Sequence, residues 1–316
     1  HSLASIKAVE AAMGVEISEQ TDKLRILAHY GEQIESHVLH VGYLVAPDLL
    51  GQKSVVPLAS SHPEVLKTVI SLHKLGNHMM EVLAGRKTHP IRLVPGGFAR
   101  LPTTADLREL KGRLEAAVPE LEALAGVILS LAGMIPDFHR DTEYIALKKT
   151  PTYPFYHGEI GSSDTEELIP ISEFERVVNE YVSPQSTAKW ARWHRDSYFV
   201  GALARFNLNG EYLLPLAKKV AGMFGLEPGC NNSYLNSVAQ LVETVHVVER
   251  SIQLIDEILT TGIVFERPQV TPRAGNGAGC VEAPRGILFH RYEFDDQGRC
   301  LKANICIPTN QNHANI

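Results

Sequence analysis

The feature of this sequence that most constrains its fold is a long helical repeat near the start of the chain. From Ser18 to about Ala46 the apolar residues recur at intervals of three and four. These positions are Leu24, Leu27, Gly31, Ile34, Val38, Val41 and Val45. Such spacing gives a helix one apolar face. A helix of this length needs other elements to cover that face, so the repeat predicts a helical core.

Further helices are predicted in the next hundred residues. Ser61-His62-Pro63-Glu64 has the form of a capping box with proline in the first turn, and it predicts a helix that runs to Gly85. Another helix should begin at Thr103, and we expect Pro119 to interrupt or restart it. The segment from Ala123 to Ile135 is apolar almost all round, which predicts a helix buried on every side.

The remaining chain mixes short strands with helices. Tyr144–Leu147 and Pro154–Glu159 are separated by proline and glycine and are typical of strands. Helical periodicity returns at Ser172–Tyr181, at Tyr212–Phe224 and from about Asn232 to Thr260. Near the end, Asp295-Asp296-Gln297-Gly298 lies between two strand-like runs and predicts a hairpin.

These patterns together predict a mainly α fold, with one large helical domain and small β-hairpin and strand additions. The single core should span 1–316, with helical parts at about 1–135 and 172–260. A β-rich insert is expected at about 143–170 and the hairpin at about 286–307. Since the chain opens on His1 rather than Met and stops just after a strand-like run, we expect a piece truncated at both ends.

Composition excludes several classes of function. The 316 residues carry a net charge of −6, which argues against a nucleic-acid partner. No apolar run is long enough for a transmembrane segment, and no signal peptide opens the chain. The four cysteines are scattered, which favours a reducing compartment and a cytoplasmic location.

Three constellations leave chemical and structural interpretations open. His37 and His40 lie on neighbouring positions of one helix face and could be either site residues or buried histidines at a helix end. Glu243-x-x-His246-x-x-Glu249 has the spacing of di-iron bundles, but no second copy is present, so a solvated or core role is favoured. The glycine-rich segment 274–279 lacks the helix and lysine of a phosphate loop. It favours tight backbone packing and no bound nucleotide.

A more specific pattern is Glu282-Ala283-Pro284-Arg285-Gly286. A proline-fixed arginine beside a glycine presents its guanidinium from a stiff backbone. An arginine that only pairs with a buried carboxylate is the alternative.

Four blocks together resemble the large, catalytic subunit of nickel–iron hydrogenases over essentially the whole chain. They are His1–Ser5, Ser36-His37-x-x-His40 leading to Pro47-Asp48, Glu282–Gly286, and Ile307-Pro308-Thr309-x-x-Asn312. Leu44–Asp48 and Gln311–Ile316 are most similar to the cytosolic, NAD(P)-linked or bidirectional branch.

The resemblance implies roles for several residues around a nickel–iron centre with cyanide and carbon monoxide ligands. Arg285 and Thr309 would donate hydrogen bonds to the cyanides, and the apolar wall would consist of Pro284, Leu288 and Pro308. Asp48 would form an ion pair with Arg285. His1 would tune a bridging thiolate, and the main-chain carbonyl of Ile305 would bind a magnesium-type ion.

The same resemblance implies what must come from elsewhere. The family holds its metals through two C-x-x-C pairs, and Cys230, Cys280, Cys300 and Cys306 match neither. No thiolate ligand is therefore expected in this chain, and the fragment alone is expected to be inactive. Electrons from reversible, heterolytic H2 oxidation would pass to an iron–sulfur small subunit, docked near the helices around the site. NAD(P)- or carrier-reducing subunits would follow.

Two alternatives remain at this point. The first is the quinone-site subunit of complex I-type oxidoreductases, a metal-free homologue. The second is a helical interaction protein without a metal. The paired histidines and the Pro308-Thr309-x-x-Asn312 block favour hydrogenase over the first.

Overall fold

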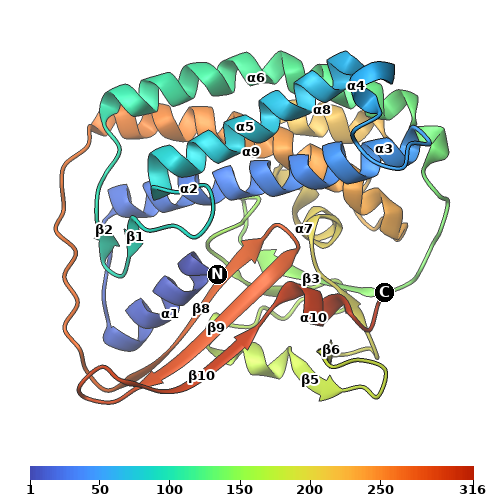
Figure 1. The fold of residues 1–316 in the computed structure, drawn as a ribbon. Coiled ribbons are helices and arrows are strands. Elements are labelled where there is room, and N and C mark those ends of the chain that lie inside the picture. The colour runs from blue at the N-terminus through green and yellow to red at the C-terminus, as the bar shows by residue number, and fades with distance from the viewer.

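Long helices form the upper layer of the computed structural model, which describes residues 1–316 (Figure 1). The helices are α1 Ser2–Met13, α2 Glu19–Val38, α3 Ala46–Leu49, α4 Leu58–Ser61, α5 Pro63–Ala84, α6 Thr104–Ser130, α7 Ala202–Asn209, α8 Pro215–Met223, α9 Asn236–Thr261 and α10 Pro308–Asn312. Helices α2, α5, α6 and α9 pack together and enclose most of the main apolar core.

Small sheets lie beneath this helical layer (Figure 1). Their strands are β1 Leu93–Val94, β2 Gly97–Phe98, β3 Glu143–Lys148, β4 Glu159–Ser162, β5 Asn179–Val182, β6 Lys189–Arg192, β7 Tyr198–Phe199, β8 Gly275–Ala283, β9 Gly286–Phe294 and β10 Cys300–Cys306. Strands β8, β9 and β10 form an antiparallel sheet in the order β10-β9-β8. The turn between β8 and β9 points towards the helices.

The predicted helix from Ser18 to about Ala46 is confirmed, with one irregularity. Ser18 caps α2 by accepting a hydrogen bond from the Thr21 amide. The helix then widens into a π-helical segment at Leu39–Val45 before α3 begins. π-helical turns are rare and are often found at functional sites. The apolar repeat alone gives no sign of this widening.

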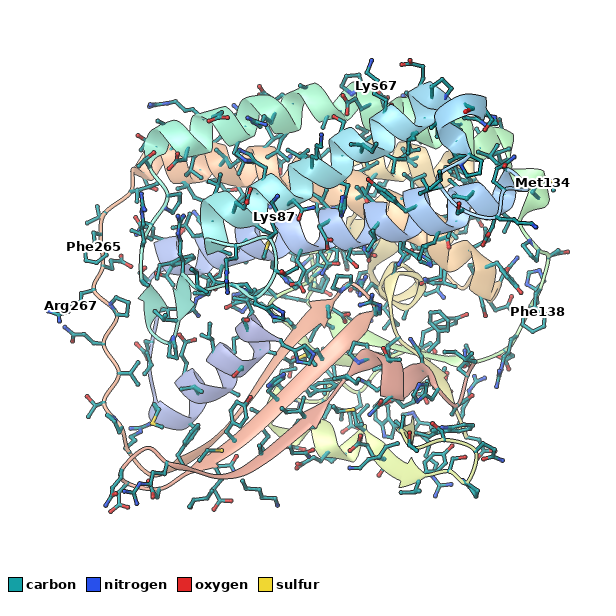
Figure 2. All side chains as sticks on the ribbon, viewed as in Figure 1. Lys67, Lys87, Met134, Phe138, Phe265 and Arg267 are labelled. Carbon is teal, nitrogen blue, oxygen red and sulfur yellow. The ribbon has the colours of Figure 1, made fainter.

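Three details of the predicted helices are wrong. Helix α5 ends at Gly85 as expected, but no side chain caps its start, so the capping box at Ser61 does not form. Helix α6 continues through Pro119 without a break. Ala123–Ile135 is not buried on every side, because α6 ends at Ser130 and Met134 is 65% exposed at the edge of the molecule (Figure 2).

The β predictions hold in part. The hairpin of β9 and β10 and the strand at Tyr144–Leu147 are confirmed. The segment Pro154–Glu159 is irregular until β4 begins at Glu159. The helix expected at Ser172–Tyr181 is only a 3-10 turn at Ile171–Arg176 followed by β5, because short apolar runs do not separate helix from strand.

The glycine-rich segment forms β8, a strand that the sequence pattern did not predict. Its tight packing is confirmed, because helix α1 lies directly across it. A Cβ atom at Gly277 would lie 2.3 Å from the amide nitrogen of Ala12, and one at Gly279 would lie 2.3 Å from the carbonyl oxygen of Ala4. Glycine is required here by the closeness of the two backbones.

Two further features concern the surface. The connection between α9 and β8 runs along the outside of the molecule, and Phe265 and Arg267 project from it (Figure 2). None of the helices combines the length and apolar character that a bilayer crossing requires.

Candidate functional site

The candidate site is a cavity of about 250 Å³ at the turn between β8 and β9. Ala283 pairs with Gly286 across the two strands, so Pro284 and Arg285 form the tip of the hairpin. The polar and proline residues that line the cavity are Ser36, His40, Asn236, Gln240, Pro284, Arg285, Thr309 and Asn312. Two blocks that are far apart in the sequence therefore meet in one place, and the π-helical segment contributes His40.

The lining of this cavity suits a negatively charged group. Arg285 is exposed and forms no ion pair within 4 Å, and no Asp or Glu side chain lines the cavity. Ser36 and Thr309 add hydroxyls, and Asn236, Gln240 and Asn312 add amides. A guanidinium with free N–H groups beside neutral donors binds anions well.

The expected ion pair between Asp48 and Arg285 does not form. Asp48 is exposed in α3 and lines a separate cavity with Met134 and Tyr234. The expectation assumed a buried guanidinium, for which an unpaired charge would be costly. Arg285 is exposed, so water solvates both charges and neither requires the other.

The predicted apolar wall is only partly assembled at the cavity. Pro284 lines it, but Leu288 is buried in the main core and Pro308 is buried at the start of α10. Thr309 is placed beside Arg285 by α10, whose first residue is Pro308. The structure thus brings Pro284, Arg285 and Thr309 together at the cavity, whereas Leu288 and Pro308 are buried and do not line it.

Helix α10 is fixed to the hairpin and to the residues before α7 by two amides. Asn312 accepts a hydrogen bond from the Val200 amide at 2.9 Å and donates one to the Val200 carbonyl at 3.0 Å. Gln311 donates to the Ile287 carbonyl at 2.7 Å and accepts from the Tyr198 hydroxyl at 3.1 Å. These bonds fix the position of α10, which carries Thr309, relative to the hairpin that carries Arg285.

A fully buried arginine lies directly behind the hairpin tip. Arg205, on α7, forms ion pairs with Glu243 at 2.6 Å and with Glu282 at 2.9 Å. Burial alone would lower the pKa of Arg205, but the two carboxylates raise it above its ordinary value. The sequence patterns did not point to this residue. Its only signal was a lone arginine in the otherwise uncharged stretch Ala202–Asn209.

The two carboxylates differ in their environments. Burial acts to raise the pKa of Glu243, but Arg205 and His37 outweigh it and lower the pKa to about 2. Tyr153 also donates to Glu243, at 2.7 Å. Burial raises the pKa of Glu282 to about 7, because Arg205 and the Leu147 amide compensate only in part.

The paired histidines have different roles in this structure. His37 is buried, and its Nε2–H donates to Glu243 at 2.8 Å. Burial lowers the pKa of His37, so the ring is neutral with its proton on Nε2. His40 is half-buried, with Nδ1 2.6 Å from the Gln240 amide oxygen, and it faces the cavity. One is therefore a buried histidine and the other a lining residue.

His1 and Ile305 lie away from the cavity. The Nδ1 atom of His1 is 3.2 Å from Nε2 of His290, which in turn is bonded through Nδ1 to the Tyr292 hydroxyl at 2.7 Å. Ile305 is on β10 opposite His290 and is 43% exposed. Their metal-related roles stay predictions from the resemblance.

The remaining candidates have structural roles. Glu249 accepts the amides of Leu216 and Ala217 at the start of α8, and His246 is buried against Tyr153. This agrees with the favoured core interpretation of Glu243-x-x-His246-x-x-Glu249. No group of three or more His, Cys, Asp or Glu side chains has a geometry able to hold a metal ion.

The cysteines are unpaired and scattered. Cys280 and Cys306 are buried and Cys300 is exposed. A β-bulge between Cys300 and Lys302 breaks the alternation of side chains along β10, and Cys300 is exposed whereas Cys306 is buried.

The chain is similar to hydrogenase subunits along almost its entire length. It is 34% identical to the vhu-type component of the F420-non-reducing hydrogenase of Methanocaldococcus jannaschii, over 99% of this chain and 80% of the relative. It is 31% identical to the alpha chain of sulfhydrogenase 2 of Pyrococcus furiosus, over 98% of this chain and 72% of the relative. No protein-family model matches the chain.

The fold agrees with these relatives. An NAD+-reducing [NiFe]-hydrogenase in the H2-reduced state superimposes with a TM-score of 0.87 at 26% identity, over 99% of this chain and 75% of that one. The quinone-site alternative is therefore not favoured. The chain belongs to the family of nickel–iron hydrogenase large subunits, which are oxidoreductases.

Proposed function

We propose that this chain belongs to a hydrogenase catalytic subunit that oxidises H2 reversibly, and that the cavity at Arg285 faces the nickel–iron centre. The observation that carries the proposal is the meeting of Pro284 and Arg285 with Thr309, from two separate family blocks, in one cavity that no Asp or Glu side chain lines. The relatives' names support the reaction.

The residues of this cavity fit the outer side of such a centre. Cyanide ligands carry negative charge and accept hydrogen bonds, and the lining offers one unpaired guanidinium, two hydroxyls and three amides. None of the four cysteines lines the cavity, so this chain supplies donors and walls rather than thiolates. When bound, the centre supplies the redox chemistry that splits H2 heterolytically.

The chain's own side chains then have defined tasks. Arg285 stays protonated at neutral pH, since a guanidinium does not lose its proton in this range. It therefore orients and stabilises negative charge rather than acting as a base. Thr309 donates its hydroxyl proton to a second acceptor, and Pro284 keeps water away from the same side. Asp48, His1 and Ile305 stay site residues by resemblance only.

Our proposals for the partner and the location are supported by the family. The relatives belong to larger enzymes, and we propose that the electrons pass to an iron–sulfur small subunit. An NAD(P)- or carrier-reducing subunit would complete the assembly, and we propose the cytoplasm as its location. We likewise propose that the chain belongs to the cytosolic, NAD(P)-linked or bidirectional branch and that NAD(P) or a similar carrier accepts the electrons.

The proposal is tested by replacing Arg285 in the full-length, matured enzyme. Arg285→Lys keeps the charge but loses the forked geometry, and we expect a loss of H2-dependent dye reduction of about 100-fold, the size typical of a removed oriented donor. Arg267→Lys is the matched control, because Arg267 projects from the outer connection far from the cavity (Figure 2).

Nickel and iron contents of both variants should equal those of the unmodified enzyme. Full activity of Arg285→Lys with normal metal content would refute the role of this cavity.

A further inference from the structure

All five N–H groups of Arg205 are used, and they hold the backbone that carries Arg285. Nε and Nη2 donate to the two carboxylate oxygens of Glu243 at 2.6 and 2.7 Å. Nη1 donates to the Glu282 carboxylate at 2.9 Å. The remaining N–H groups donate to the main-chain carbonyls of Ala283 at 3.0 Å and Pro284 at 3.2 Å. One side chain thus fixes three consecutive residues before Arg285.

The opposite side of the hairpin tip is held by backbone contact. Gly286 has φ +133, and a Cβ atom there would lie 2.5 Å from the side chain of Val200. Gly201 also has a positive φ, and its own added Cβ would lie 3.2 Å from the Arg285 carbonyl. The tip is therefore clamped between Arg205 on one side and Val200–Gly201 on the other.

The Arg285 side chain forms no hydrogen bond or ion pair that would fix its direction, and its charge acts on the Glu32 carboxylate only through space. It is exposed and forms no ion pair. Its direction depends on where the main chain of Pro284 and Arg285 lies, and Arg205 is the side chain that bonds to that stretch of backbone.

We propose that Arg205 is a positioning residue for Arg285. Through its two carbonyl bonds and the Glu282 carboxylate it sets the backbone of the hairpin tip. Through Glu243 it joins that backbone to His37 of α2 and Tyr153. The inference rests on the proposed function, since it assumes that the direction of Arg285 matters for catalysis.

A purely structural ion pair would look different. Stability needs a charge next to a carboxylate, and lysine could supply that charge. A lysine has three N–H donors on one nitrogen and cannot reach two carboxylates and two carbonyls in a planar fork. Arg205→Lys therefore keeps the positive charge but loses the bonds that depend on the planar guanidinium, so it distinguishes the two roles.

The test uses the matured, full-length enzyme with its partner subunits. Arg205→Lys is compared with Arg250→Lys, which changes the partly exposed ion pair of Arg250 with Glu257 on α9. We expect amide hydrogen exchange in the peptide around Arg285 and Gly286 to rise several-fold in Arg205→Lys only. This readout is also made on protein without metals.

The loaded enzyme supplies two further readouts. The infrared bands of the cyanide ligands should shift in Arg205→Lys, because Arg285 no longer donates along the same line. Since a misplacement of about 1 Å can reduce the rate about 100-fold, kcat should fall by up to that factor with little change in KM for H2. Arg250→Lys should leave all three readouts unchanged.

Two outcomes would overturn the inference. One is unchanged exchange, infrared bands and kcat in Arg205→Lys while Arg285→Lys is impaired. The other is faster exchange throughout the protein, which would assign Arg205 a merely structural role. If Arg205→Lys does not fold, Glu282→Ala removes one anchor and leaves the pair with Glu243 intact. It should raise exchange at the same peptide, and unchanged exchange there would equally overturn the inference. Failure of the proposed function is distinct, since Arg285→Lys would then be fully active.

Discussion

The contact between α1 and the glycine-rich strand β8 gives a sharp prediction for Gly277→Ala. The new methyl group would lie 2.3 Å from the Ala12 amide nitrogen and 2.3 Å from the Ala8 carbonyl oxygen. Ordinary contacts between such atoms are about 3.5 Å or longer, so α1 must move away by about 1 Å. Both obstructing atoms belong to the backbone and cannot rotate away. Overpacking of this kind costs about 1–3 kcal/mol, and we expect the upper half of that range.

The assay is urea unfolding, with the thermal midpoint as a second measure. Gly277→Ala should lower the free energy of unfolding by about 2–3 kcal/mol and Tm by several degrees. Gly126→Ala is the matched control, because Gly126 lies in helix α6 with no atom within 4 Å of the new methyl group. It should raise stability by about 0.5–1 kcal/mol. Equal stabilities for Gly277→Ala and the unmodified protein would refute the close approach.

Three further predictions concern the site and the helices. The pKa of Glu282 is raised from 4.5 to about 7 in the folded state, which therefore binds the proton more tightly than the unfolded state does. The free energy of unfolding should fall by about 3 kcal/mol as the pH rises from about 4.5 to 7. In urea unfolding at pH 5 and 8, Glu282→Gln should remove this pH dependence, and an unchanged pH dependence would count against the prediction. Asn312→Ala loses both hydrogen bonds to Val200 and should lower the free energy of unfolding by about 1–3 kcal/mol. Proteolysis near Val200 should become faster, and an unchanged cleavage rate would contradict the role of these two bonds. Thr103→Ala removes the cap that Thr103 forms with Asp106 and should cost about 1 kcal/mol, while Thr104→Ala next to it should cost much less.

Long periodic helices and the family blocks could be predicted from the sequence. The apolar repeat after Ser18, the stop at Gly85 and the hairpin around Asp295–Gly298 all correspond to elements of the structure. These signals are local, since each depends on side chains within one element. The two blocks that meet at the candidate cavity were identified by their resemblance to family motifs, and in Glu282–Gly286 the proline-fixed arginine was a local signal as well.

The remaining features depend on contacts between distant parts of the chain. Arg205 is placed against Glu243 and Glu282 by tertiary packing, and the residues next to it in the sequence do not predict those partners. The π-helical segment at Leu39–Val45 keeps an acceptable apolar spacing, so the repeat could not reveal it. The ion pair of Asp48 with Arg285 was inferred because their family blocks were expected to meet at one site. That expectation does not determine whether the two side chains are buried, and both are exposed.

The packing of α1 also has a consequence for the order in which the chain can fold during synthesis. Helix α1 comprises residues 2–13, yet its main partners, β8 and β9, are made at residues 275–294. At about 5–20 residues per second, a ribosome needs roughly 15–50 s between the two. During that interval the face of α1 that carries Ala4, Ala8 and Ala12 lacks the strand β8 that lies against it in the finished protein. Helix α1 is therefore among the last of these elements to be locked in place, and a chaperone that protects nascent chains would have a long opportunity to bind it.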